Sequence, residues 1–178
     1  MVSEKHLSQV GGVSAIVGVV LLVIGTLLHP LSADPGDATA AFTEYAADGS
    51  WVFTHLLQLL GAVLIGGGLI ALAWKLRAGA AGAWALLAVL VTVATVALAG
   101  ALQAVDGVAL KIMVDRWVAA GADGAPVFEA TYAVRQIEVG LASMMGVLFG
   151  LAVLLYGVAM IASPITPRWL GAIGVLTG

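Results

Sequence analysis

Two things are scarce in this sequence: cysteine is absent, and charged residues make up only 10% of the 178 positions. The absence of cysteine excludes disulfide bonds, thiolate metal sites and dithiol redox chemistry. Soluble domains average about 25% charged residues, so this chain lacks the charge to cover a surface exposed to water. The net charge of −3 also provides no basic field that would attract nucleic acid.

Apolar residues are correspondingly abundant, at 62% of the chain, and they are grouped in long runs. A helix needs about 20 such residues to cross a hydrocarbon core of ~30 Å. We therefore predict an all-α membrane protein, a four-transmembrane-helix bundle that forms a single domain. The predicted spans are residues 10–29, 51–74, 84–106 and 137–161.

The first polar connection, residues 31–50, is acidic and lies between the first two spans. Asp37 precedes good helix formers and is a candidate N-cap for a short helix through Ala46; an ordinary solvated loop is the alternative. At the other end of the chain, residues 165–178 follow a proline-containing turn and are too short to cross. We expect this segment to lie at the membrane interface or to begin a further span.

The second polar connection, residues 107–134, allows two interpretations. The helical pattern of the third span either continues past the bilayer to Trp117 or breaks at Gly107. Gly, Asp and Pro in residues 121–126 indicate a loop before the fourth span.

The distribution of basic residues predicts the orientation. With the N-terminus in the cytoplasm, the inner side holds Lys5, Lys75, Arg77 and Arg168, and the outer side holds Lys111, Arg116 and Arg135. This is a small positive-inside excess. We therefore predict a multi-pass plasma-membrane protein with a cytoplasmic N-terminus, and both polar connections on the outer side.

Polar side chains gather near the outer end of every predicted span. They are His29, His55, Gln58, Gln103, Asp106, Arg135 and Glu138. Ionisable groups inside spans are costly, usually face the bundle interior and commonly mark functional sites. The other half of each span is nearly free of them, so this end of the bundle is where a site is expected.

The two histidines of this group suggest a haem site. His29 and His55 lie at similar depth on consecutive antiparallel spans, and helical bundles commonly bind b-type haem through axial histidines. Lys111, Arg116 and Arg135 are then candidates to pair with the haem propionates. Such a site would serve electron transfer, or haem sensing or storage, although the sequence identifies no redox partner.

A divalent metal is the second interpretation. His29, His55, Asp106 and Glu138 offer the imidazole and carboxylate ligands typical of catalytic zinc or non-haem iron. A metal-bound water could attack an ester or amide of a lipid, as in a membrane hydrolase, and a non-haem iron would suit an oxidoreductase. No HExxH motif or histidine pair at i, i+4 supports this assignment.

A third interpretation needs no cofactor. The polar group could bind a small molecule, or it could consist only of interfacial side chains that extend to water in a structural membrane protein. Transport is less favoured, because four spans are few and no inverted repeat is visible. Helix faces of aliphatic and small residues are compatible with a homodimer, which the sequence neither requires nor excludes.

The order His29-Pro30, an acidic loop, then Trp51-x-x-x-His55 at the start of the second span resembles small multi-span membrane proteins of unknown function from high-GC bacteria. The resemblance covers mainly residues 25–75. It implies no activity, but it favours treating the two histidines as a set.

Overall fold

The computed structural model describes residues 3–178, which are mostly helical and contain no strand. In chain order the elements are α1 (Glu4–Leu28), α2 (Ala38–Ala47), α3 (Trp51–Lys75), α4 (Ala80–Ala104), the π-helix η1 (Val105–Leu110), α5 (Lys111–Ala120), the short 3-10 helix η2 (Gly121–Asp123), α6 (Ala125–Ala162) and α7 (Arg168–Thr177). Within residues 3–178, four helical segments are long and apolar enough to cross a membrane. The predicted all-α, four-span architecture is confirmed.

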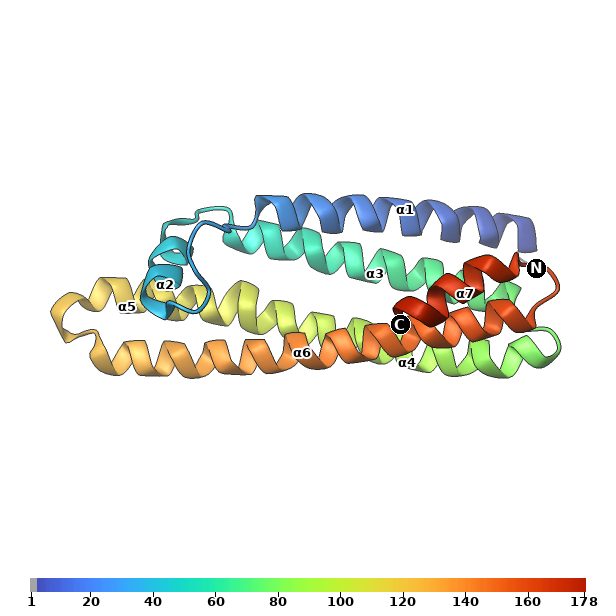
Figure 1. Ribbon diagram of the computed structural model, residues 1–178. Coiled ribbons are helices and arrows are strands. Elements are labelled where there is room, and N and C mark those ends of the chain that lie inside the picture. Colours follow the sequence, from blue (N-terminus) through green and yellow to red (C-terminus); the bar gives the residue numbers. More distant parts are fainter. Residues whose placement is uncertain (1–2) are drawn as a thin grey trace.

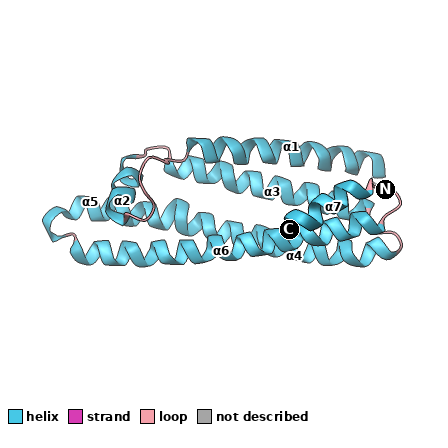
Figure 2. Cartoon of the chain, in the orientation of Figure 1, coloured by secondary structure: helices cyan, strands magenta, loops and turns pink. Residues whose placement is uncertain are grey.

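The spans form two antiparallel pairs that lie side by side (Figure 1). One pair is α1 with α3, the other is α4 with α6, and contacts between α3 and α4 join them. The helix α2 packs against α5 at one end of the bundle, which we call the α2 end. At the opposite end α7 folds back along α6 (Figures 1 and 2).

Small residues allow α1 and α3 to pack closely. Gly11, Gly18 and Gly25 recur on one face of α1 and are its buried residues. A Cβ atom on Gly18 would lie 2.7 Å from the carbonyl oxygen of Gly61 on α3, so only glycine permits this backbone approach. The Ser14 hydroxyl adds a 2.8 Å hydrogen bond to the carbonyl of Leu64.

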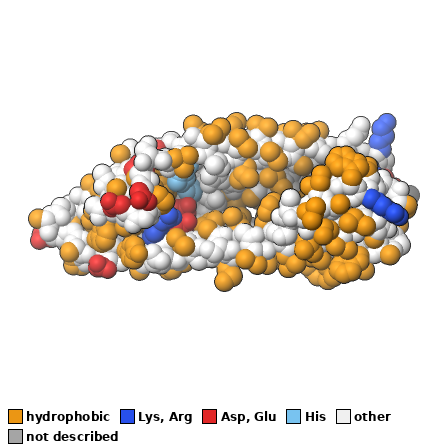
Figure 3. Space-filling model, in the orientation of Figure 1, with side chains coloured by type: hydrophobic (Ala, Val, Ile, Leu, Met, Phe, Trp, Pro, Cys, Tyr) orange, Lys and Arg blue, Asp and Glu red, His pale blue; other side chains and the backbone are white. Residues whose placement is uncertain are grey.

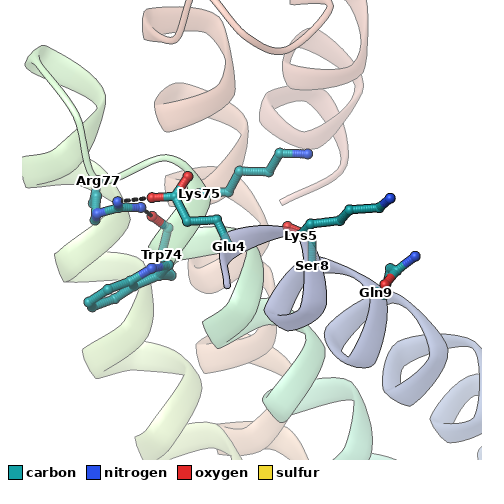
Figure 4. A pocket seen from close by; sticks show the side chains of 7 residues that line it. All are labelled: Glu4, Lys5, Ser8, Gln9, Trp74, Lys75 and Arg77. Atoms are coloured by element: carbon teal, nitrogen blue, oxygen red, sulfur yellow. Dashed lines mark hydrogen bonds and ion pairs between the residues drawn. The ribbon is translucent and has the colours of Figure 1, made fainter. Parts of the chain in front are cut away.

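At the end of the bundle away from α2, an ion pair joins α1 to the residues that follow α3. The Arg77 guanidinium forms an ion pair with Glu4 at the start of α1 (Figure 4). Its carbon lies 4.7 Å from the centre of the Trp74 ring, a cation–π distance. The two helix ends are therefore held together where they leave the predicted span.

The outward faces of the helices are apolar, as a hydrocarbon solvent requires. Leu27 is 75% exposed and Val147 69% exposed, and hydrophobic side chains cover the upper edge of the molecule and the half that carries α7 (Figure 3). Charged and histidine side chains gather toward the α2 end, while Lys and Arg also mark the opposite end (Figure 3).

The two connections that the sequence left open contain helices. Asp37 is the N-cap of α2 and accepts hydrogen bonds from the backbone N–H groups of Thr39 and Ala40, at 3.0 and 3.1 Å. The third span continues through η1 into α5 without a break at Gly107. The helix α6 likewise begins at Ala125, well before the predicted membrane entry near residue 137.

Candidate metal centre at the α2 end

Three residues from three different elements converge at the α2 end. One ligand atom from each of His29, His55 and Asp106 lies within 4.8 Å of the others. His29 is the C-cap residue of α1, His55 lies in the second turn of α3, and Asp106 lies in η1. The structure thus brings together three of the four predicted metal ligands.

Both imidazole rings are oriented by backbone carbonyls. The Nδ1 atom of His55 lies 2.7 Å from the Trp51 carbonyl oxygen, and that of His29 lies 3.0 Å from the Pro30 oxygen. A carbonyl only accepts, so in each ring Nδ1 carries the proton and donates it. In the neutral ring this leaves the Nε2 lone pair free, which is the arrangement that metal-binding histidines commonly adopt.

The centre also contains buried polar atoms without hydrogen-bond partners. His55 is only 2% exposed, and its Nε2 lies 3.1 Å from Asp106 Oδ2. This is an ion-pair distance if the ring is protonated, but with the proton on Nδ1 of the neutral ring, Nε2 has no hydrogen-bond partner in the described chain. Asp106 Oδ1 is also buried and unpartnered there. Buried polar groups are rarely left unsatisfied, so these two atoms point to a ligand between the side chains.

The π-helix η1 positions the carboxylate. Its wider turn changes the rotation of the chain at Asp106 and Gly107, and π-turns inside α-helices are frequent at functional sites. The indole N–H of Trp51 donates a 2.9 Å hydrogen bond to the Asp106 carbonyl. This bond links η1 to the first turn of α3.

Aromatic rings enclose the histidines on the side of α2. The Trp51 ring centre lies 4.8 Å from that of His29 and 4.6 Å from that of His55. Tyr45 packs on Trp51 at 4.5 Å and lies 6.2 Å from His29. Burial raises the pKa of the Tyr45 hydroxyl, so this wall is uncharged at neutral pH.

The two glutamines of the predicted polar group lie next to the centre, further into the span. The Gln103 side-chain amide donates a 3.3 Å hydrogen bond to the Gln58 oxygen. The Gln103 oxygen itself is buried and has no partner within the described residues. The pair therefore joins α3 to α4 one helical turn away from His55 and Asp106.

Glu138 is the predicted ligand that the structure does not bring into this group. Its side chain is buried on α6 and forms an i, i+3 ion pair with Arg135. It remains within electrostatic range of Asp106 and His55. The carboxylate thus lies beside the centre, and its charge is balanced by Arg135.

The other two basic residues predicted to pair with haem propionates do not contact the histidines. Lys111 donates to the carbonyls of Tyr45 and Ala46 at the C-terminal end of α2, at 3.0 and 2.8 Å, and pairs with Asp115 at 2.9 Å. Arg116 is exposed and makes no hydrogen bond or ion pair within residues 3–178. Lys111 therefore secures α2 over the site.

The sequence did not reveal the roles of Trp51 and Tyr45. A tryptophan at the start of a span commonly lies at the lipid headgroup level, yet Trp51 is only 1% exposed and contacts both histidines. The spacing of Trp51 and His55 at i, i+4 was the available signal, since such residues share a helix face. Nothing in the sequence pointed to a π-turn at Val105–Leu110.

Comparison with known proteins offers no further guide to this centre. No protein-family model, no curated protein and no solved structure matches this chain.

Proposed function

We propose that this chain is a multi-pass plasma-membrane protein whose function depends on a divalent metal ion held by His29, His55 and Asp106. The single observation that carries the proposal is the convergence of these three donors around unpartnered buried atoms. Two histidines and one carboxylate are a common ligand set of catalytic zinc and of non-haem iron(II).

The separation of the donors suits a small ion. Metal–ligand bonds of about 2.0–2.2 Å place two ligand atoms no more than about 4.4 Å apart. Donors within 4.8 Å of one another therefore need only small side-chain rotations to close on an ion. Three protein ligands leave coordination positions open, which is typical of catalytic rather than structural sites.

The chemistry follows from this open coordination. A bound ion supplies Lewis acidity or a water of lowered pKa, or electron transfer if it is iron. On the protein side, the carbonyls of Trp51 and Pro30 hold the imidazoles in the ligating tautomer. Glu138, close to Asp106 but outside the ligand group, is the candidate to exchange protons with a substrate. This arrangement supports a hydrolase or oxidoreductase that acts at the membrane surface.

Haem b bound by the same histidines is the second candidate, since both rings present a free Nε2 atom. The ring centres of His29 and His55 are 5.2 Å apart, and Trp51 packs against both. A porphyrin between the rings would have to displace this packing, whereas an ion does not. The geometry therefore favours the ion.

The test is metal analysis of protein purified in mild detergent after growth with added zinc, or with added iron and a haem precursor. We expect about one ion per chain, as in a mononuclear site, and loss of most of it in His29→Gln and Asp106→Asn. His6→Gln is the matched control, because the third histidine is exposed near the start of α1.

The optical spectrum of the same samples separates the candidates. A Soret band that is lost in His55→Ala would replace the metal proposal with haem. Metal content that does not change in His29→Gln and Asp106→Asn would reject the site altogether. Far-UV circular dichroism of each variant shows whether a loss of metal reflects a loss of helix.

A further inference from the structure

We infer that the metal centre acts on a long-chain lipid, whose oxygen-bearing head lies at the metal and whose hydrocarbon chain occupies an apolar cavity in the middle of the bundle. This inference rests on the proposed function, because the metal supplies the contact for the head. It adds the class of substrate and a second, separate binding site.

The cavity lies between all four spans and has a volume of about 230 Å³. Its inner surface includes Thr92 and Ala99 of α4, both buried, and Gly66 of α3. Leu22 and Phe149 also line it and are 36% and 50% exposed. The cavity therefore opens sideways, between α1 and α6, toward the lipid that surrounds the spans. A hollow is visible on this face of the molecule (Figure 3).

Helical register places this cavity directly beneath the metal centre. On each span, a residue that lines the cavity lies two helical turns, about 10 Å, from one of the polar residues that the sequence placed at the end of that span. The pairs are Leu22 with His29, Ala62 with His55, Ala99 with Asp106, and Met145 with Glu138. Ala62 and His55 both lie within the regular helix α3 and, two turns apart, share a helix face, so the inner face of α3 lines both the centre and the cavity.

The depth of the cavity matches one leaflet of a bilayer. Its lining on α3 runs from Ala62 to Leu69, which covers about 10–20 Å below the level of His55. A hydrocarbon core of ~30 Å gives each leaflet about 15 Å of chain. A chain whose head lies at the centre would therefore end inside the cavity.

An apolar chain is the occupant that the lining selects. Apolar cavities of ~150 Å³ stay dry and accept small hydrocarbons such as benzene, and this cavity is larger. The hydroxyls of Thr92 and Thr95 donate to the carbonyls of Ala88 and Val91 at 2.8 Å. They therefore offer their methyl groups and no free donor to the interior.

The Gln58–Gln103 pair lies at the level between the two sites. This hydrogen-bonded pair joins α3 to α4, whereas the open side of the cavity lies between α1 and α6. A Cβ atom on Gly25 of α1 would lie 2.8 Å from Gln58 Cγ, so Gln58 packs against α1. A chain that reaches both sites therefore runs past this pair on the side of α6.

The probe for the test is a saturated long-chain fatty acid with a photoactivatable diazirine near its terminal methyl group. We expect illumination of the metal-loaded protein to label the cavity segments of α4 and α6, as mapped by mass spectrometry of peptides. The hydrocarbon of equal length, with the same diazirine and no carboxylate, is expected to label them several-fold less.

Filling the cavity should remove the labelling. A Cβ atom on Gly146 meets no atom within 4 Å, so Gly146→Leu adds a side chain at the cavity without a backbone clash. We expect about tenfold less labelling, because the added side chain takes the volume that the chain needs. Ala62→Leu fills the cavity from α3 and tests the same prediction if Gly146→Leu does not fold. Gly140→Leu is the matched control, since Gly140 is also unhindered on α6 but does not line the cavity.

The outcomes separate the two proposals. Equal labelling of wild type, Gly146→Leu and Ala62→Leu, with metal still bound, would overturn the lipid inference and leave the metal site intact. Labelling by the acid no stronger than by the hydrocarbon would overturn the placement of the head at the metal. Absence of metal from the same samples would reject the proposed function itself, whatever the labelling.

Discussion

Gly107 faces the His55 side chain so closely that a Cβ atom on Gly107 would lie 2.6 Å from His55 Cβ and 3.0 Å from its Cγ. The contact joins the π-turn of the third span to the second turn of α3. It sets how near Asp106, the neighbour of Gly107, comes to the imidazole.

Gly107→Ala should therefore move His55 and weaken metal binding, although the substitution removes none of the three ligands. We expect a loss in metal affinity of about 10–100-fold, the usual effect of disturbing groups that orient ligands. Competition with a chromophoric chelator measures it. Gly100→Ala on α4 is the control, because its added methyl group meets no atom within 4 Å. Equal affinities of the two variants would contradict a positioning role for Gly107.

Trp51→Phe keeps an aromatic ring between the histidines but removes the indole N–H that bonds to the Asp106 carbonyl. Loss of a hydrogen bond typically costs about 0.5–1.5 kcal/mol, so we expect a lower midpoint of thermal unfolding in detergent and weaker metal binding. Trp74→Phe is the comparison, since Trp74 is 53% exposed. A similar shift in both variants would assign the effect to lost ring volume.

Lys111→Met should release α2 from the bundle. The ammonium group donates to two carbonyls at the end of α2, and hydrogen bonds to charged groups contribute about 1.5–3 kcal/mol. We expect amide exchange in α2 to accelerate by at least tenfold, with looser packing of Tyr45 beside His29. Arg116→Met removes the same charge from α5, where Arg116 has no partner within residues 3–178. If it accelerates exchange equally, net charge rather than the bonds is responsible.

Glu44 gives the loop before α2 a dependence on pH. Its carboxylate accepts the N–H groups of Ser32 and Ala33, each at 2.9 Å, and the bond from Ala33 in particular lowers the pKa of Glu44 below its usual value of 4.5. A carboxyl group whose pKa is lower in the folded state stabilises that state above its unfolded pKa. The stabilisation is lost as pH falls through the folded value.

Protection factors of the Ser32 and Ala33 amides, normalised for intrinsic exchange, should thus be constant near neutral pH. They should fall as the pH drops below the usual pKa of glutamate and through the lowered pKa of Glu44. Glu44→Gln should show low protection at every pH. Glu129→Gln changes an exposed carboxylate elsewhere and should leave the profile intact. A profile in Glu44→Gln that follows wild type would show that other contacts order this loop.

The sequence by itself determined the four spans and the end of the bundle that carries polar chemistry. A transmembrane helix satisfies its backbone hydrogen bonds internally, so the hydropathy of about 20 consecutive residues is enough to identify it. The same local reasoning placed His29, His55, Asp106 and Glu138 at one level. It also offered Asp37 as a candidate cap, because a cap bonds to residues just beyond it, although it favoured a solvated loop that the structure replaces with α2.

Only the tertiary structure decided which of these polar side chains meet. His29, His55 and Asp106 converge, whereas Glu138 pairs with Arg135 and Lys111 bonds to α2. Those choices depend on how each helix is rotated and which neighbour it packs against, and such relationships join residues far apart in the chain. The π-turn, the burial of Trp51 and the apolar cavity arise in the same way, from packing between helices that no local pattern records.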